Sequence, residues 1–269
     1  MLDNKPYVGV TGVMWRRETV EILKVIDPNS FDSHQFMVGV LVNSLTLKDK
    51  DQLFPGRYPI RWNLTEIFTN DPRCLNILHF YTTCKKFSDQ MFAFLELAGK
   101  HCHGFQLNFP HPDREQLEKY LNNTSAKRII LQIGRDIFRE YDFNLEQIFT
   151  YTKQYEDVIT DVLFDLSGGT GEFLNVPLAH QFLQRFTNAF DKPINCGIAG
   201  GLRIDRISEI YELLHEFPNT SLDAEGQLRT PQSDPVNNKL NTMCAHAYVT
   251  GTLSIINHAQ NLKPVLAAI

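Results

Sequence analysis

The chain has 269 residues, of which 43% are hydrophobic and 21% are charged, so it can bury a large core without disulfide bonds. A net charge of −5 offers no basic surface to nucleic acid or anionic lipid, and we find neither a secretory leader nor about 18 apolar residues in a row. Five cysteines, an odd number without CxxC spacing, favour a reducing compartment, and we therefore expect a cytoplasmic protein without nucleic-acid or membrane partners.

Short apolar runs separated by helical stripes fill the first half of the chain. The predicted strands cover residues 7–11, 36–42, 75–81, 104–109 and 128–133. A short helix is expected over 65–68, and a capping box of Asp113 and Gln116 is expected to start a later helix. The longer predicted helices carry, in turn, Val20, Leu23 and Ile26, then Phe87, Met91, Phe94 and Ala98, then Leu117, Tyr120 and Leu121.

Two predicted connections are unusually long. Residues 43–61 are polar and contain Pro55, Gly56 and Pro59, whereas residues 134–144 combine charged and aromatic side chains. Long connections in compact domains often carry functional groups. A further helix is expected after the second connection, over about 145–155.

The second half of the chain continues the alternation. Strands are predicted at 161–165, 194–198 and 221–224. Helices are predicted to begin near Pro177 and Ile204, and a long final helix is predicted from about 236 to about 259. Eight strands alternating strictly with eight helices favour a closed (β/α)8 barrel over an open doubly wound sheet, and residues 1–269 are expected to form one domain.

Acids and glycines gather where the last three predicted strands end. They are Asp165, Gly168, Gly169, Thr170 and Gly171 after the sixth strand, Gly200 and Gly201 after the seventh, and Asp223, Glu225 and Gly226 at the eighth. All strands of such a barrel end on one face, where the last loops commonly hold phosphate on backbone N–H groups. Glycine can also be present only for its conformational freedom, and Asp165 could simply cap a turn. We expect one of Asp223 and Glu225 to point into the barrel wall.

Segments along most of the chain resemble the phosphoribosylanthranilate isomerase family of tryptophan biosynthesis, whose fold is a (β/α)8 barrel. The most specific match is Phe164-Asp165 with residues 168–171, which is similar to the family pattern LLDS…GGTG. The weaker matches are VGVTG at 8–12 to KICG, FPGRY at 54–58 to an SPR-containing loop, QLN at 106–108 to QLHG, AGGL at 199–202 to AGGL, and LDA at 222–224 to a DVS segment.

The resemblance implies a phosphorylated sugar derivative as substrate and a role for each matching residue. Asp165 would be the general acid, Thr11 and Glu225 would complete the catalytic group, and the glycine loops would hold the phosphate. The residues expected to contact the substrate are Arg57, Asn108 and Asp223. Thr11 stands where the family has its general-base cysteine, and Asn108 where it has a histidine. A threonine hydroxyl is too weakly acidic to act alone as a base, so either the base has moved or the reaction has changed.

Two functional classes stay open at this point. One is an isomerase-like enzyme that transfers protons on a small phosphorylated molecule, and the other is a catalytically silent barrel that keeps the phosphate site for binding or regulation. A second carboxylate facing Asp165, such as Glu225, would favour the enzyme. A homo-oligomer is compatible with either class.

Other chemistries have weaker support in the sequence. His101-Cys102-His103 lacks a second ligand cluster, and Lys85 and Lys86 follow a strand in a polar turn, so neither a zinc site nor a Schiff base is favoured. We expect no metal and no cofactor. His79 is expected to be a core histidine, and Arg203 to lie either beside the phosphate or in solvent.

Overall fold

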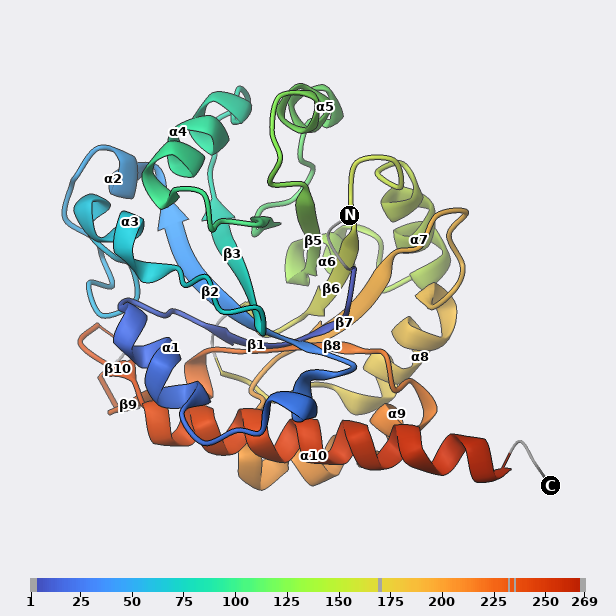
Figure 1. Ribbon diagram of the computed structural model, residues 1–269. Coiled ribbons are helices and arrows are strands. Elements are labelled where there is room, and N and C mark those ends of the chain that lie inside the picture. Colours follow the sequence, from blue (N-terminus) through green and yellow to red (C-terminus); the bar gives the residue numbers. More distant parts are fainter. Residues whose placement is uncertain (1–3, 169–170, 232, 235, 267–269) are drawn as a thin grey trace.

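Eight parallel strands close into a barrel in which each strand pairs with the next and β8 pairs with β1 (Figure 1). The computed structural model describes residues 4–168, 171–231, 233–234 and 236–266. The barrel strands are β1 (Tyr7–Thr11), β2 (Gln35–Asn43), β3 (Cys74–Tyr81), β4 (Gly104–Leu107), β5 (Arg128–Gly134), β6 (Asp161–Asp165), β7 (Asn195–Ala199) and β8 (Ser221–Ala224). The predicted (β/α)8 barrel is therefore confirmed.

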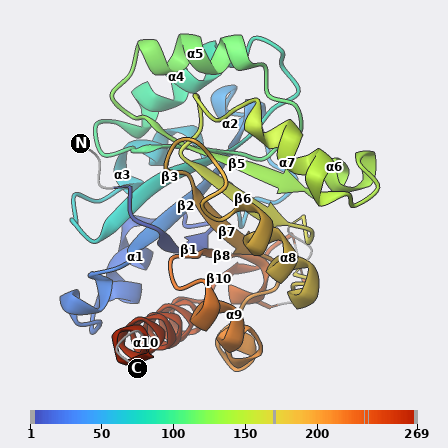
Figure 2. The same cartoon turned by 90° about the vertical axis from the view of Figure 1, so that its right-hand side faces the viewer.

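Helices surround the barrel on its outside (Figure 2). They are α1 (Arg16–Leu23), α2 (Ser44–Leu47), α3 (Leu64–Ile67), α4 (Ser88–Ala98), α5 (Arg114–Asn122), α6 (Arg135–Glu140), α7 (Leu145–Lys153), α8 (Val176–Phe186), α9 (Tyr211–Glu216) and α10 (Thr242–Leu266). Short 3₁₀ turns are η1 (Pro28–Phe31), η2 (Arg61–Asn63), η3 (Ile204–Ile210) and η4 (Gly226–Leu228). No helix in the described ranges is both long enough and apolar enough to cross a membrane.

Side chains alternate along each strand between two cores. One set points outward and packs against the helices, as Phe80, Phe105 and Phe164 do. The other set fills the inside of the barrel. Its apolar members are Tyr7, Met37, Leu75, Ile77, Ile130, Leu163 and Ala199. Polar side chains follow these apolar ones toward the carboxyl ends of the strands. The inside of the barrel is therefore a packed core, and its carboxyl-terminal end, here called the mouth, is polar.

Several helix starts follow from side-chain caps. Asp113 accepts a hydrogen bond from the N–H of Glu115 at 2.9 Å and so begins α5 at the predicted position. The expected capping box is wrong, because the side chain of Gln116 accepts from Ser88 instead. Asn241 accepts from the N–H groups of Met243 and Cys244, so α10 starts after it.

The region before α10 differs from the prediction. A two-stranded antiparallel sheet of β9 (Arg229–Thr230) and β10 (Lys239–Leu240) precedes the helix, so Val236 lies outside it. The helix also continues past 259, to Leu266. Apolar residues at 236 and 240 resemble a helical stripe, but Leu240 packs into the core as part of a strand.

Smaller differences lie in three other segments. The connection over 134–144 contains α6, whose side chains Ile137 and Phe138 are buried although the segment is highly charged. Helix α1 ends before Ile26, and its Val20 is 57% exposed, so the predicted stripe is only partly right. Strand β4 ends at Leu107, which places Asn108 just beyond it.

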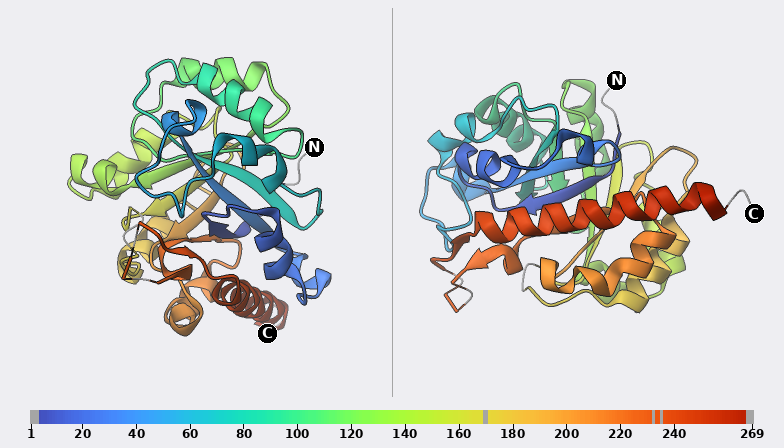
Figure 3. Two further views of the ribbon diagram at one scale, coloured as in Figure 1. Left: turned by 90° about the vertical axis from the view of Figure 1, so that its left-hand side faces the viewer. Right: turned by 60° about the horizontal axis from the view of Figure 1, so that its bottom comes forward.

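Helix α10 runs along the outside of the barrel and packs against α1, η3 and α9 (Figures 1 and 3). Its buried side Ala245, Val249, Leu253 and Ile256 faces these elements. The small sheet of β9 and β10 lies at the amino-terminal end of this helix (Figure 1). The last sixth of the chain thus reaches both the outer wall and, through Arg229, the mouth of the barrel.

Candidate active site

Thr11, Asp223 and His79 form a hydrogen-bonded network at the mouth of the barrel. The Thr11 hydroxyl donates to Asp223 Oδ1 at 2.8 Å, and both ring nitrogens of His79 lie 3.3 and 3.4 Å from the Thr11 oxygen. All three side chains are buried, with exposures of 2%, 7% and 1%. Thr11 therefore ends β1 and donates a hydrogen bond to a carboxyl group.

Burial controls the protonation of this network. It raises the pKa of Asp223 to about 7, and the nearby charges of Glu225 and Asp165 raise it as well, whereas the hydrogen bond from Thr11 lowers it. Burial lowers the pKa of His79 to about 3, so its ring is neutral near neutral pH. Asp223 is thus the group of this network that exchanges a proton close to pH 7.

A glycine on the neighbouring strand makes room for the network. A Cβ atom on Gly39 would lie 2.4 Å from Thr11 Oγ1 and 2.7 Å from His79 Nε2. Any other residue there would force Thr11 and His79 apart. A glycine within a strand, such as Gly39, can indicate a close contact of this kind. The sequence alone does not show which residues make the contact, because that depends on the pairing of β2 with β1 and β3.

Asp223→Asn tests the buried acid through stability. A folded-state pKa of about 7, above the ordinary 3.8, makes the native protein bind the proton more tightly than the unfolded chain. The stability contribution is therefore full below pH 3.8 and is lost as the pH rises to about 7. Between about pH 5 and about pH 8, wild type should lose on the order of 2 kcal/mol more unfolding free energy than Asp223→Asn in urea titrations. Parallel pH profiles of the two proteins would contradict the assignment.

Asp165 is held by four donors at the end of β6. Its Oδ1 accepts from the N–H of Ser167 at 2.8 Å, the Ser167 hydroxyl at 2.7 Å and the N–H of Gly168 at 3.3 Å. Its Oδ2 accepts from Gln132 Nε2 at 2.8 Å. The turn-cap explanation thus holds for Oδ1, while Oδ2 faces the carboxamide of Gln132 in the mouth.

Glu225 pairs with Arg57 across the mouth. Arg57 Nη1 donates to Glu225 Oε1 at 3.2 Å, and the two side chains are 16% and 18% exposed. Burial and, to a smaller extent, the charge of Asp165 raise the pKa of Glu225, whereas the positive charges of Arg57 and Arg229 lower it. The expectation that Asp223 or Glu225 points into the wall is wrong. Asp223 on β8 accepts from Thr11, and Glu225, which lies just beyond the strand, pairs with Arg57, so both side chains lie at the mouth. The charge of Glu225 raises the pKa of Asp223 there.

Arg229 ties the loops around the mouth together. Its guanidinium donates to the backbone oxygens of Gly12 and Gly56 and, from Nε at 3.1 Å, to Asn238 Oδ1. The side chain has no exposed surface, and burial lowers its pKa to about 10, so it stays charged near neutral pH. The sequence analysis missed this residue. It follows β8 without a motif, and its role depends on loops far away in the chain.

The predicted phosphate loops lie together. Gly200 and Gly201 have φ of 125° and 54°, and a Cβ on Gly201 would lie 2.7 Å from Phe173 Cα, so the loop after β6 packs onto the loop after β7. Gln227, in the turn that begins at Gly226, donates to the oxygen of Gly171 at 2.7 Å. In the described part of the chain, no acceptor takes the N–H of Gly200 or Gly201. Gly169 and Thr170 lie outside the described residues.

Two neighbouring cavities open between the strand ends of β3 to β6. The smaller, about 310 Å³, is lined by Asn108, Gln132, Ser167 and Gly168 among others, so it borders the residues that hold Asp165. The larger, about 640 Å³, shares Asn108 and continues past Tyr81. These cavities, the smaller of which borders the residues that hold Asp165, form the candidate active site.

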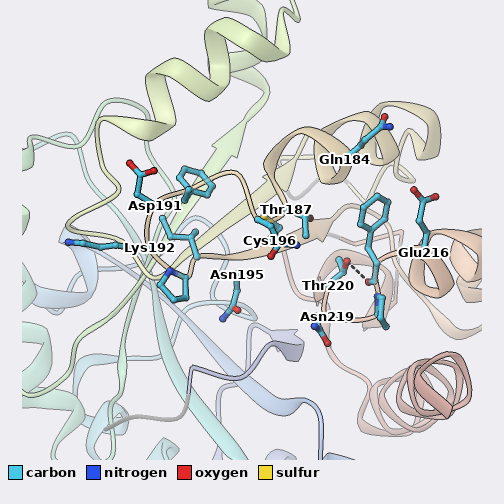
Figure 4. Close-up of a pocket in the computed structure, with 15 residues that line it drawn as sticks. Gln184, Thr187, Asp191, Lys192, Asn195, Cys196, Glu216, Asn219 and Thr220 are labelled. Atoms are coloured by element: carbon cyan, nitrogen blue, oxygen red, sulfur yellow. Dashed lines mark hydrogen bonds between the residues drawn. The ribbon is translucent and has the colours of Figure 1, made fainter. Parts of the chain in front are cut away.

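A separate cavity of about 710 Å³ lies at the opposite end of the barrel (Figure 4). It is lined by the start of β7, including Asn195 and Cys196, and by the turn before β8, including Thr220. The Thr220 hydroxyl donates to Phe217 O and Asn195 Nδ2 to Asn4 O, so polar groups there are engaged within the protein. Although this cavity is larger, it is remote from the acid cluster.

The remaining predicted residues are structural or peripheral. His103 Nδ1 accepts from the N–H of Asn76 at 2.8 Å, and no group of three metal-ligating side chains occurs among the described residues. Lys85 and Lys86 are exposed. Arg203 contacts Gln227 at 3.4 Å and Asp205 at 2.9 Å, which places it at the rim of the glycine loops.

The fold and the mouth together define a (β/α)8 barrel protein with a cluster of acids at its mouth. No family model and no curated protein matches the chain. Solved structures do match it. A phosphoribosyl anthranilate isomerase in complex with reduced 1-(o-carboxyphenylamino)-1-deoxyribulose 5-phosphate has a TM-score of 0.60 at 12% identity, over 93% of this chain and 99% of that one.

Two further structures show a similar likeness. Tryptophan synthase subunit alpha from Legionella pneumophila str. Paris has a TM-score of 0.55 at 9% identity, over 95% of this chain and 94% of that one. Triosephosphate isomerase from Bartonella henselae has a TM-score of 0.50 at 10% identity, over 94% and 99% of the chains. At such identities the likeness establishes the barrel fold, and the reaction must be argued from the site.

Proposed function

We propose that this protein is an isomerase-like enzyme that transfers protons on a phosphorylated small molecule bound at the barrel mouth. The observation that carries the proposal is Asp223, a buried carboxyl group with a pKa of about 7 that shares the mouth with Asp165. A group whose pKa lies near the working pH serves well both as a proton acceptor and as a proton donor. Proton transfer next to a carbonyl group uses a general base and a general acid on one substrate.

Asp223 is the proposed base. The resemblance leaves the base unassigned, because Thr11 replaces the expected cysteine, yet the Thr11 hydroxyl points at Asp223. Thr11 is then a positioning residue that fixes one oxygen of the Asp223 carboxyl group. In this arrangement the base has moved from β1 to β8.

Asp165 is the proposed general acid. Its proton would lie on Oδ2, because Oδ1 already accepts from Ser167 and Gly168. A protonated Oδ2 needs an acceptor, and rotation of the Gln132 carboxamide presents its oxygen in place of its nitrogen. Glu225, whose pKa is raised by burial, adds a further carboxyl group to the mouth and pairs with Arg57.

The glycine loops after β6, β7 and β8 are the proposed phosphate site. The Gly200 and Gly201 N–H groups have no acceptor within the described residues, and the short turn η4 begins beside them at Gly226. Loops at this place and a short extra helix commonly bind phosphate in barrels. Arg203 at the rim adds a positive charge.

Gly200→Val tests the phosphate site. The Gly200 φ of 125° disfavours any side chain, so valine should turn the loop and weaken binding of a phosphate ester by about tenfold or more, as measured by calorimetry. The matched control is Gly99→Val, which has a φ of 73° and open space around its Cβ, on the outside of the barrel. Equal phosphate affinity in the two variants would place the site elsewhere.

A catalytically silent binding protein is the second candidate. The ion pair of Arg57 and Glu225 favours it, because the pair neutralises the arginine expected to contact a substrate. The two candidates differ in one measurement. An enzyme should exchange substrate C–H protons with deuterated water in the presence of sugar phosphates, whereas a silent barrel should bind them without exchange.

A further inference from the structure

Asn108 presents an unused carboxamide to the mouth. Its Oδ1 is buried, and neither Oδ1 nor Nδ2 has a hydrogen-bond partner among the described residues. The residue lines both mouth cavities, which are the space that a ligand would enter. Unpaired polar atoms at such a place are costly unless a ligand or water satisfies them.

A second carboxamide lies one layer deeper on the same side of β4. Gln106 is 2% exposed, its Oε1 has no partner, and its Nε2 reaches Gln132 Oε1 only at 3.4 Å. Gln132 in turn donates to Asp165 Oδ2. Three carboxamides, those of Asn108 just beyond β4, Gln106 on β4 and Gln132 on β5, therefore lie between the smaller cavity and the proposed acid.

The smaller cavity offers neutral hydrogen-bonding groups and no unengaged cation among its described lining residues. Its one arginine, Arg135, donates to Leu166 O at 2.9 Å and to Glu172 at 2.8 Å. Asp136 adds a negative charge at the rim. A ligand carboxylate would find no positive charge to pair with there, whereas hydroxyl groups can both donate to and accept from carboxamides.

We propose that the substrate is a polyhydroxylated phosphate ester, whose hydroxyl-bearing end enters the cavity of about 310 Å³ and is bound by Asn108 and Gln132. This inference rests on the proposed function, because it takes the phosphate to lie in the glycine loops. It sets this chain apart from a barrel built for a ligand with a carboxyphenyl end, such as the one in the similar isomerase structure. The carboxamides, not a cation, select the substrate.

Calorimetry with four probes tests the inference, using inorganic phosphate, ribitol, ribitol 5-phosphate and reduced 1-(o-carboxyphenylamino)-1-deoxyribulose 5-phosphate. Ribitol 5-phosphate should bind the wild-type protein about tenfold or more tightly than either phosphate or the carboxyphenyl compound. Asn108→Leu, similar in shape, should remove that advantage and leave the affinity for phosphate unchanged. The control is Asn63→Leu, an asparagine that lines a cavity on the outer wall and should change neither affinity.

The outcomes separate this inference from the phosphate site. Tighter binding of the carboxyphenyl compound, or an Asn108→Leu variant that keeps the full preference for ribitol 5-phosphate, would overturn the inference while the phosphate site stands. Binding of free ribitol that depends on Asn108, without any binding of phosphate, would support the hydroxyl-binding role of Asn108 but overturn the phosphate site, and with it the phosphate ester as substrate. No binding of any probe would overturn both.

Discussion

Asparagine in place of Asp223 or of Asp165 is expected to lower proton exchange by about 10²–10⁴-fold, the usual effect of removing a general acid or base. Asparagine keeps the shape of the side chain and one accepting oxygen, but it can neither accept nor release the proton. The measurement is incorporation of deuterium from solvent into sugar phosphates, followed by NMR. Affinity for phosphate should stay nearly unchanged in both variants, because the carboxamide oxygen at position 165 can still accept from the N–H groups of Ser167 and Gly168, where the glycine loop begins.

Thr11→Val provides the control for this result. It removes the hydroxyl that donates to Asp223 but keeps the acid, and loss of this hydrogen bond should raise the pKa of Asp223 further. Exchange of substrate protons should persist, but its rate should rise at a higher pH than in the wild-type protein. Full exchange in Asp223→Asn would show that another group is the base, and absence of exchange in the wild-type protein with every sugar phosphate would favour the silent barrel.

Arg229→Met is expected to lower the unfolding free energy by about 3 kcal/mol or more. Methionine fills similar volume but leaves the buried oxygens of Gly12, Gly56 and Asn238 without their donor. It also removes a positive charge beside Glu225. Urea denaturation monitored by circular dichroism measures the loss.

Arg114→Met is the matched control for that experiment. Arg114 also bonds to carboxylates and to a backbone oxygen, but its side chain is 42% exposed, and such surface pairs contribute about 1 kcal/mol or less. Equal losses in the two variants would show that Arg229 has no special part in organising the mouth.

The fold could be predicted mainly from patterns within short segments of the sequence. The apolar run Tyr7–Thr11 gave a strand with the observed bounds, because strands buried on both faces have few polar residues. Ser221–Ala224 was also placed correctly, although Ser221 and Asp223 are polar. The segment around α6 was harder, since six residues with four charges show little apolar stripe even though Ile137 and Phe138 are buried. Helix α10 was misplaced because β10 interrupts its apparent stripe.

The site was predictable only in part, for a different reason. Asp165 and the glycine loops could be found because each motif is local in the chain. The contact of Thr11 with Asp223 joins residues 212 apart, and that of Gln132 with Asp165 depends on the register of β5 and β6. Counting in twos from Thr11, Gln132 and Asp223 along their strands would have shown that these polar residues face inward.

The position of Arg229 in the chain has a consequence for how the protein is assembled. Its bonds to Gly12 and Gly56 join residues 217 and 173 positions apart, so they form only after nearly the whole chain has been synthesised. A nascent chain that ends with β8 contains all eight strands of the barrel but not the Arg229 side chain that holds the loops of the mouth together. The organised mouth is thus a late product of folding, and it depends on the same C-terminal segment that lays α10 along the barrel wall.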